Sequence, residues 1–117
     1  MMQGQYPFTR LRRNRLQSFS RELVQENRLH TSDLIYPVFV IDQNEGSQAI
    51  DSMPSLERHS LQSLIKVAHN CVEKGIQAIA LFPSIEKSKK EWDGREAHNP
   101  NGLIPRAIKA LKKEVPS

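Results

Sequence analysis

The chain has 117 residues, 38% of them hydrophobic and 26% charged, which suits one compact unit with a modest core. No apolar stretch approaches the roughly 20 residues of a membrane span, so we expect no membrane partner. The net charge of +4 is too small to require a nucleic-acid partner. A single cysteine, Cys71, cannot form an internal disulfide, and we expect a reducing compartment, the cytoplasm.

The N-terminal residues 1–14 show no apolar periodicity and are predicted to form an extended arm. From about residue 15 to residue 26, Leu16, Phe19 and Leu23 form one narrow stripe, which predicts a weak helix. Such a stripe cannot fold alone, so it should lie against another part of the chain or another subunit.

An arginine cluster marks this end of the chain: Arg10, Arg12, Arg13, Arg15 and Arg21. It could contact nucleic-acid phosphates, but few aromatic side chains accompany it. We favour the alternative, an arm whose arginines pair with carboxylates of another subunit.

Residues 34–41 form a continuous apolar run that predicts a strand buried on both faces, as in parallel sheets. Pro37 disfavours a central position in the sheet, because proline cannot donate to the ladder. Residues 42–59 are predicted to form a long polar loop. A helix should follow over residues 60–74, with Ser60 as its N-cap and Gly75 as the glycine that ends it.

Residues 78–82 predict a second buried strand, which Pro83 should end. After a loop over residues 84–101, a second amphipathic helix is expected, with its apolar face formed by Ile104, Ala107, Ile108, Leu111 and Val115. Two parallel strands are not a stable sheet, and the chain stops where a third strand should begin. The pattern fits either the first quarter of a (β/α)8 barrel or the start of an open doubly wound sheet.

No phosphate-binding, dinucleotide-binding or metal-binding motif is present. His69 and Cys71 would point to different faces of their helix, and Cys71 is expected in the core. The other histidines, His30, His59 and His98, are interpreted as loop or surface residues. In parallel α/β folds chemistry gathers after the strands, so residues 42–59 and 83–101 are the candidate loops. Phe82, at the end of the second strand, is either a core residue or the hydrophobic wall of a ligand site.

Several segments in order resemble porphobilinogen synthase (5-aminolevulinate dehydratase), a haem-pathway family, from about residue 7 onward. They are residues 9–13, 26–29, 33–40, 52–54, 75–76, 80–83, 90–97 and 99–103. The string at 33–40 and the loop ending Asn99-Pro100-Asn101-Gly102-Leu103 are specific in combination. Two residues depart from the family pattern: Ser55 replaces a usual glycine, and Arg95 replaces a usual serine.

The resemblance implies a (β/α)8 TIM barrel whose N-terminal arm wraps a neighbouring subunit, usually in a homo-octamer. It implies a lyase that condenses two 5-aminolevulinate molecules, with loss of water, to porphobilinogen. Two lysines would bind the substrates, at least one as a Schiff base. Zinc serves many members and magnesium serves others. Phe82 matches a residue of the substrate pocket, and Arg10, Arg12 and Arg13 match a region that docks on another subunit.

The family's lysines and metal ligands lie further along than Ser117, so this chain is assigned no catalytic residue and no metal ligand. Its lysines at 66, 74, 87 and 109 lie on polar positions and are poor Schiff-base candidates. We therefore expect an arm at residues 1–32 and the first part of a TIM barrel (β-α-β-α) at residues 33–117, inactive alone. The alternative is a non-catalytic basic βαβ module for binding or assembly.

Overall fold

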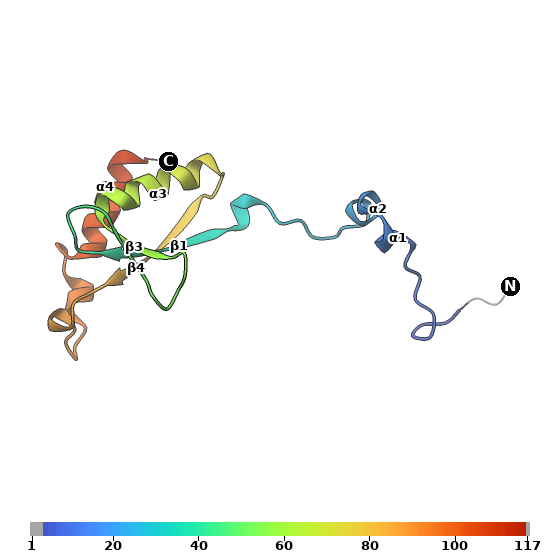
Figure 1. The fold of residues 1–117 in the computed structure, drawn as a ribbon, viewed down its shortest axis with the longest axis horizontal. Coiled ribbons are helices and arrows are strands. Elements are labelled where there is room, and N and C mark those ends of the chain that lie inside the picture. The colour runs from blue at the N-terminus through green and yellow to red at the C-terminus, as the bar shows by residue number, and fades with distance from the viewer. Residues whose placement is uncertain (1–3, 117) are drawn as a thin grey trace.

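The computed structural model describes residues 4–116, and consists of an N-terminal arm that extends away from an α/β unit (Figure 1). Its dimensions are 75 × 34 × 27 Å. The arm holds two short helices that pack against each other, α1 (Arg13–Leu16) and α2 (Ser18–Leu23). A single 3-10 turn, η1 (Thr31–Asp33), leads into the first strand. The predicted extended stretch therefore gives way to helix at Arg13, and its residues 1–3 lie outside the described part.

The single helix predicted over residues 15–26 is wrong in its bounds. The backbone is extended at Gln17, where ψ is 148°, and this break separates α1 from α2. Neither helix buries a residue: Leu16 is 72%, Phe19 64% and Leu23 79% exposed. A stripe with no surface to cover gains little from helix formation, which explains why the helices are short.

The sheet has four strands: β1 (Ile35–Ile41), β2 (Ser47–Ala49), β3 (Glu57–His59) and β4 (Ala78–Ser84). Their order is β2-β3-β1-β4. Strand β1 is parallel to β3 and β4, whereas β2 is antiparallel to β3. Because a helix connects the sheet back to β4, the predicted parallel strand–helix–strand arrangement is confirmed.

The polar loop predicted over residues 42–59 is wrong, because it contains the β2–β3 hairpin. Each of these strands has three residues, too few for a periodic signal in the sequence. Strand β3 pairs with β1 at Phe39 and Val40 only. The half of β1 that holds Pro37 thus has a pairing partner on one side only, which makes proline tolerable in this strand.

Two helices, α3 (Leu61–Glu73) and α4 (Leu103–Glu114), cover one face of the sheet and confirm the predicted helices. The core between the layers consists of Val38, Val40, Leu64, Leu103 and Ala107. At the start of α3 the Ser60 hydroxyl accepts a hydrogen bond from the Ser63 amide at 3.3 Å. Gly75 ends α3 with a φ of +76°, a left-handed conformation that glycine adopts without strain.

The prediction that both strands are buried on both faces is wrong. In β1 only the side chains toward the helices are fully covered, such as Val40 at 0% exposure, while Ile35 is 66% exposed. Strand β4 has no fully buried residue, and Phe82 is 49% exposed. Pro83 does not end β4 either, since Pro83 and Ser84 still pair with β1. β4 is the last strand of the sheet, so its outer edge tolerates a proline.

Candidate functional site

The uncovered face of the sheet carries an aromatic pair. Phe39 of β1 is in register with Phe82 of β4, and their ring centroids lie 5.9 Å apart at an interplanar angle of 45°. Side chains alternate between the faces of a strand, and Val38 and Val40 point into the helix-side core. Phe39 and Phe82 therefore point the other way, and Phe82 is not part of that core.

A cleft of about 220 Å³ lies where β1 and β4 end, next to the start of α4. Asp42 is one of the charged residues that line this cleft. Its Oδ2 accepts a hydrogen bond from Nη2 of Arg106 at 2.7 Å. Nζ of Lys89 lies 3.7 Å from the same oxygen. The hydrogen bond from Arg106 lowers the pKa of Asp42, and Lys89 adds to the effect. This cluster ties the end of β1 to α4, 64 residues later in the chain.

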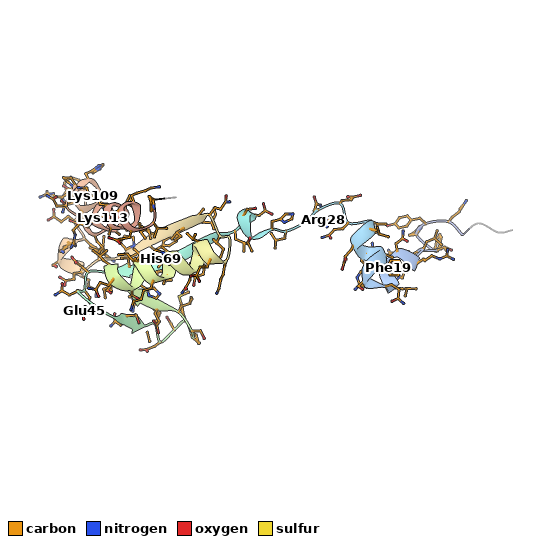
Figure 2. The ribbon with its side chains drawn as sticks, turned by 90° about the horizontal axis from the view of Figure 1, so that it is seen from above. Phe19, Arg28, Glu45, His69, Lys109 and Lys113 are labelled. Carbon is orange, nitrogen blue, oxygen red and sulfur yellow. The ribbon has the colours of Figure 1, made fainter. Side chains whose placement is uncertain are left out.

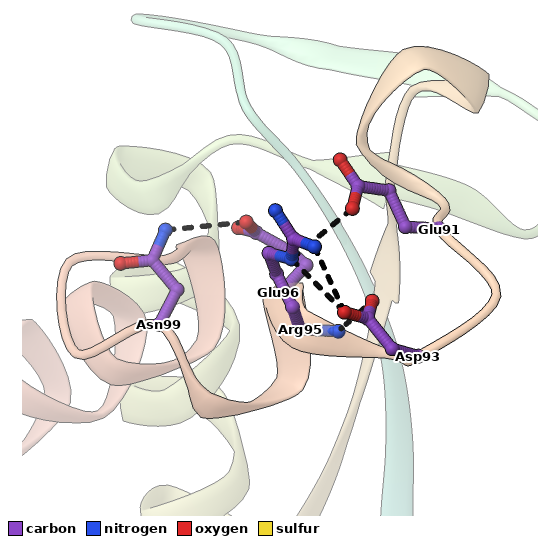
Figure 3. A network of polar contacts seen from close by, with 5 residues as sticks. All are labelled: Glu91, Asp93, Arg95, Glu96 and Asn99. Atoms are coloured by element: carbon purple, nitrogen blue, oxygen red, sulfur yellow. Dashed lines mark hydrogen bonds and ion pairs between the residues drawn. The ribbon is translucent and has the colours of Figure 1, made fainter.

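The loop between β4 and α4 is ordered by its own polar contacts (Figure 3). Arg95 binds Asp93 through Nε at 3.1 Å and Nη2 at 2.9 Å, and its Nε lies 3.1 Å from Oε2 of Glu91. Nδ2 of Asn99 donates to Glu96 at 3.2 Å. The guanidinium of Arg95 is thus occupied by neighbouring carboxylates, which clamp this loop locally.

The three predicted interface arginines lie in the exposed arm. Arg10 stacks near Tyr6, with its guanidinium carbon 5.6 Å from the ring centroid, and Arg12 and Arg13 are exposed at the start of α1. Figure 2 shows the arm's Phe19 and Arg28 far from the α/β unit that carries Lys109 and Lys113. The arm thus extends away from the α/β unit, which contains β4 and Phe82 (Figure 1).

Cys71 is buried in α3, as predicted, at 5% exposure. Burial raises the pKa of its thiol. The interpretation of His59 as a loop or surface residue is wrong, because it lies in β3, partly buried, and its Nδ1 lies 2.8 Å from Oγ of Ser63. This contact holds the hairpin against the first turn of α3.

Sequence reasoning missed Arg58, which lies in β3 directly before His59. The pairing of the strands places Arg58 within the sheet, in register with Phe39 on one side and with Gln48 on the other. No sequence signal marked it, since a strand of three residues flanked by polar loops reads as loop.

Between residues 4 and 116, no three histidine, cysteine or acidic side chains gather in a way that could hold a metal ion. The family resemblance places the zinc or magnesium ligands further along than Ser117, so none of the described residues is assigned to a metal. Within the same residues, no helix has the length and hydrophobicity needed to cross a membrane.

The strand–helix–strand unit with an open aromatic face places the chain among parallel α/β proteins. The family model for delta-aminolevulinic acid dehydratase matches residues 8–117. The chain belongs to this family. It is 44% identical over 107 residues to the delta-aminolevulinic acid dehydratase of Bradyrhizobium diazoefficiens, covering 92% of this chain and 30% of the relative. The enzyme of Bacillus subtilis is 38% identical over 109 residues, 93% of this chain and 33% of the relative.

A solved structure agrees with the sequence comparison. The crystal structure of the Toxoplasma gondii enzyme, in complex with its reaction product porphobilinogen, matches 92% of this chain with a TM-score of 0.84 at 44% identity. The match covers 30% of that structure. The chain thus spans about a third of the length of the relatives it matches.

Proposed function

We propose that this chain is the N-terminal part of an enzyme that condenses two 5-aminolevulinate molecules, with loss of water, to porphobilinogen. The observation that carries the proposal is the agreement of fold and sequence with an enzyme solved with porphobilinogen bound, at a TM-score of 0.84. The chain's own part in that reaction would be structural and binding. It supplies one wall of the site.

In this proposal, residues 33–117 form the first two β/α units of a TIM barrel, and residues 1–32 form an arm. The sheet face that the helices leave uncovered supports the proposal of a barrel. Closing a sheet into a barrel turns one face inward, and in this chain that face is the apolar side that carries Phe39 and Phe82. The ring of Phe82 would then exclude water from one side of the substrate.

The catalytic lysines of the proposed enzyme are not assigned to this chain. Lys66, Lys74, Lys87 and Lys109 are exposed to water. A lysine that forms a Schiff base is typically desolvated in an apolar pocket, and these four exposed side chains are not. The 117-residue chain should therefore be inactive by itself. We also propose that the full-length enzyme uses zinc or magnesium and is cytoplasmic. No residue of this chain is assigned to the metal.

The arm would dock on another subunit, in an octamer, through Arg10, Arg12 and Arg13. Its exposed apolar side chains support this, since Phe8 is 94% and Leu11 92% exposed. The same observation favours the second candidate, an assembly module whose arm binds intact subunits without any catalysis.

A chimera tests the proposed function. Residues 8–117 would replace the matching N-terminal third of the Bradyrhizobium diazoefficiens relative, and porphobilinogen formation from 5-aminolevulinate would be assayed. We expect the chimera to form porphobilinogen and the 117-residue chain to form none. In the chimera, Phe82→Ala should lower kcat/KM at least tenfold, because an aromatic wall of the site is lost. A folded chimera without turnover would refute the proposal.

The assembly alternative has a separate test. The 117-residue chain would be sedimented with the intact relative, beside a triple variant in which Arg10, Arg12 and Arg13 are changed to serine. A changed sedimentation profile with the chain but not with the variant would support docking through the arm. An unchanged profile with both would count against it.

A further inference from the structure

The loop between β4 and α4 is tied mostly to itself. It begins after Ser84, the last paired residue of β4, and ends at Gly102, the N-cap of α4. Within the described chain, the hydrogen bonds and ion pairs of residues 86–101 join residues of this same loop, with one exception. The exception is Lys89, whose Nζ lies 3.7 Å from Oδ2 of Asp42. The loop is therefore ordered from within and has one polar attachment to the rest of the α/β unit.

Hollows border this loop where it faces the rest of the unit. The cleft of about 220 Å³ has Glu86 and Glu96 of the loop on one side and Ile41 of β1 on the other. A second hollow, of about 340 Å³, lies between Ala97 of the loop and Ile104 in the first turn of α4. Protein interiors are otherwise close-packed. The loop is thus not wedged against the strand ends and has room to move.

Trp92, the only tryptophan of the chain, is carried by this loop in water, with 97% of its surface exposed. A buried tryptophan covers roughly 150–250 Å² of apolar surface, so the position seen leaves a large gain unused. Trp92 follows Lys89 by three residues, which span at most about 11 Å. Because Lys89 lies against Asp42, directly after β1, a movement of the loop brings Trp92 to the ends of β1 and β4.

We propose that residues 86–101 form a flap, that the ion pair of Lys89 with Asp42 holds it open, and that Trp92 folds over the ends of β1 and β4 when 5-aminolevulinate is bound. This inference rests on the proposed function. In a barrel of parallel strands the site lies at these strand ends. Closure breaks the ion pair of Lys89 but leaves Arg106 on Asp42, because Arg106 belongs to α4.

The ion pair is weak enough to release. The side chains of Lys89 and Asp42 are 48% and 45% exposed, and pairs of this kind contribute little free energy. The internal contacts of the flap, such as those of Arg95 with Asp93, do not involve the strands and are kept when the flap moves (Figure 3). The flap therefore closes as a body, without unfolding.

Kinetics of the chimera defined above test the flap. Removing the ion pair shifts the balance toward the closed state, which holds substrate longer and delays product release. We expect Lys89→Gln to lower KM about two- to fivefold without raising kcat, the range that an exposed ion pair allows. Lys90→Gln removes the same charge from the next residue, which forms no ion pair in the described chain, and should change neither constant.

Trp92→Ala should act in the opposite direction and raise KM at least about fivefold, because the closed flap loses its cover. An unchanged or raised KM in Lys89→Gln would overturn the inference. Trp92 could instead pack on another subunit. Trp92→Ala would then alter the sedimentation of the chimera and leave KM unchanged, which would also overturn the inference.

The hold of Asp42 on the flap can be measured without any turnover. In the 117-residue chain Trp92 is the sole tryptophan donor for energy transfer to an acceptor attached at Gln48→Cys, because Cys71 is buried. Gln48 lies in β2, at the far edge of the sheet from β4. We expect a wider distribution of donor–acceptor distances in Lys89→Gln than in the unchanged chain or in Lys90→Gln.

This measurement separates the two ways of failing. Equal widths in the three proteins would overturn the flap whether or not the chimera is active. A wider distribution in Lys89→Gln, together with a folded chimera that forms no porphobilinogen, would support the hold on the flap and refute the proposed function alone.

Discussion

Ser55 occupies a turn position that suits glycine better than any other residue. Met53, Pro54, Ser55 and Leu56 form a tight turn in which the Leu56 amide donates to the Met53 carbonyl at 3.1 Å. The φ of Ser55 is +69°, and among residues 4–116 no other non-glycine residue has a positive φ. Proline second and a positive φ third identify a type II turn. Replacing Ser55 by glycine should therefore stabilise the chain.

The magnitude follows from two opposing effects. A residue with a Cβ pays roughly 1–2 kcal/mol in the left-handed region. Glycine loses roughly 0.5–1 kcal/mol more than alanine when its backbone is ordered. The difference predicts that Ser55→Gly raises the free energy of unfolding by about 0.5–1 kcal/mol. For a unit of this size, the thermal midpoint should rise by about 3–6 °C.

Thermal unfolding followed by far-ultraviolet circular dichroism measures this effect. The matched control is Ser52→Gly, which lies three residues earlier in the same loop and has no positive φ. It should lower the midpoint, because glycine there adds only disorder to the unfolded chain. If Ser55→Gly lowered the midpoint as Ser52→Gly does, the turn would not be strained and the reasoning would be refuted.

Three further predictions concern the α/β unit. Asp42→Asn should destabilise it by less than about 1 kcal/mol, because the contact with Arg106 is half exposed. The lowered pKa of Asp42 means that this contribution is present above its ordinary pKa of 3.8 and disappears as pH falls through the lowered value; in urea unfolding, the difference between wild type and Asp42→Asn should be smaller at pH 3 than at pH 7. Leu64→Ala should cost about 2–5 kcal/mol in the same assay, since Leu64 is fully buried, and a loss below 1 kcal/mol would contradict the assigned core. Cys71 should react slowly with a thiol reagent at pH 8 because burial raises its pKa and blocks access, and its rate should rise sharply in denaturant; an equally fast reaction without denaturant would show that it is exposed.

The elements that sequence reasoning predicted well are those whose signals are local. Helix α3 has a hydroxyl cap at Ser60, apolar side chains at helical spacing and a stop at Gly75, all within one short segment. Strand β1 was predicted because its apolar run is long and rich in β-branched residues. The segments that resemble the family are likewise local strings. These features determine which elements form and to which family the chain belongs.

The β2–β3 hairpin and the open face depended on contacts between distant residues. Strand β3 has three residues, and its register with β1 joins Phe39 to Arg58 across a segment that reads as loop. The energy of such a strand comes from hydrogen bonds to a partner elsewhere in the chain, so its own residues carry no periodic sign of it. For the same reason the sequence could propose Phe82 as a pocket wall but could not place Arg58 beside it.

The sequence by itself thus determined helices α3 and α4, the two long strands, the family and the candidacy of Phe82, because each rests on neighbouring residues. Tertiary structure alone decided which face of the sheet the helices cover and which side chains stand next to one another on the other face. Strand pairing is non-local, and a shift of one residue in register would have moved Arg58 to the helix side. Gln48, Arg58, Phe39 and Phe82 lie at one level of the sheet only because four strands pair in one particular register.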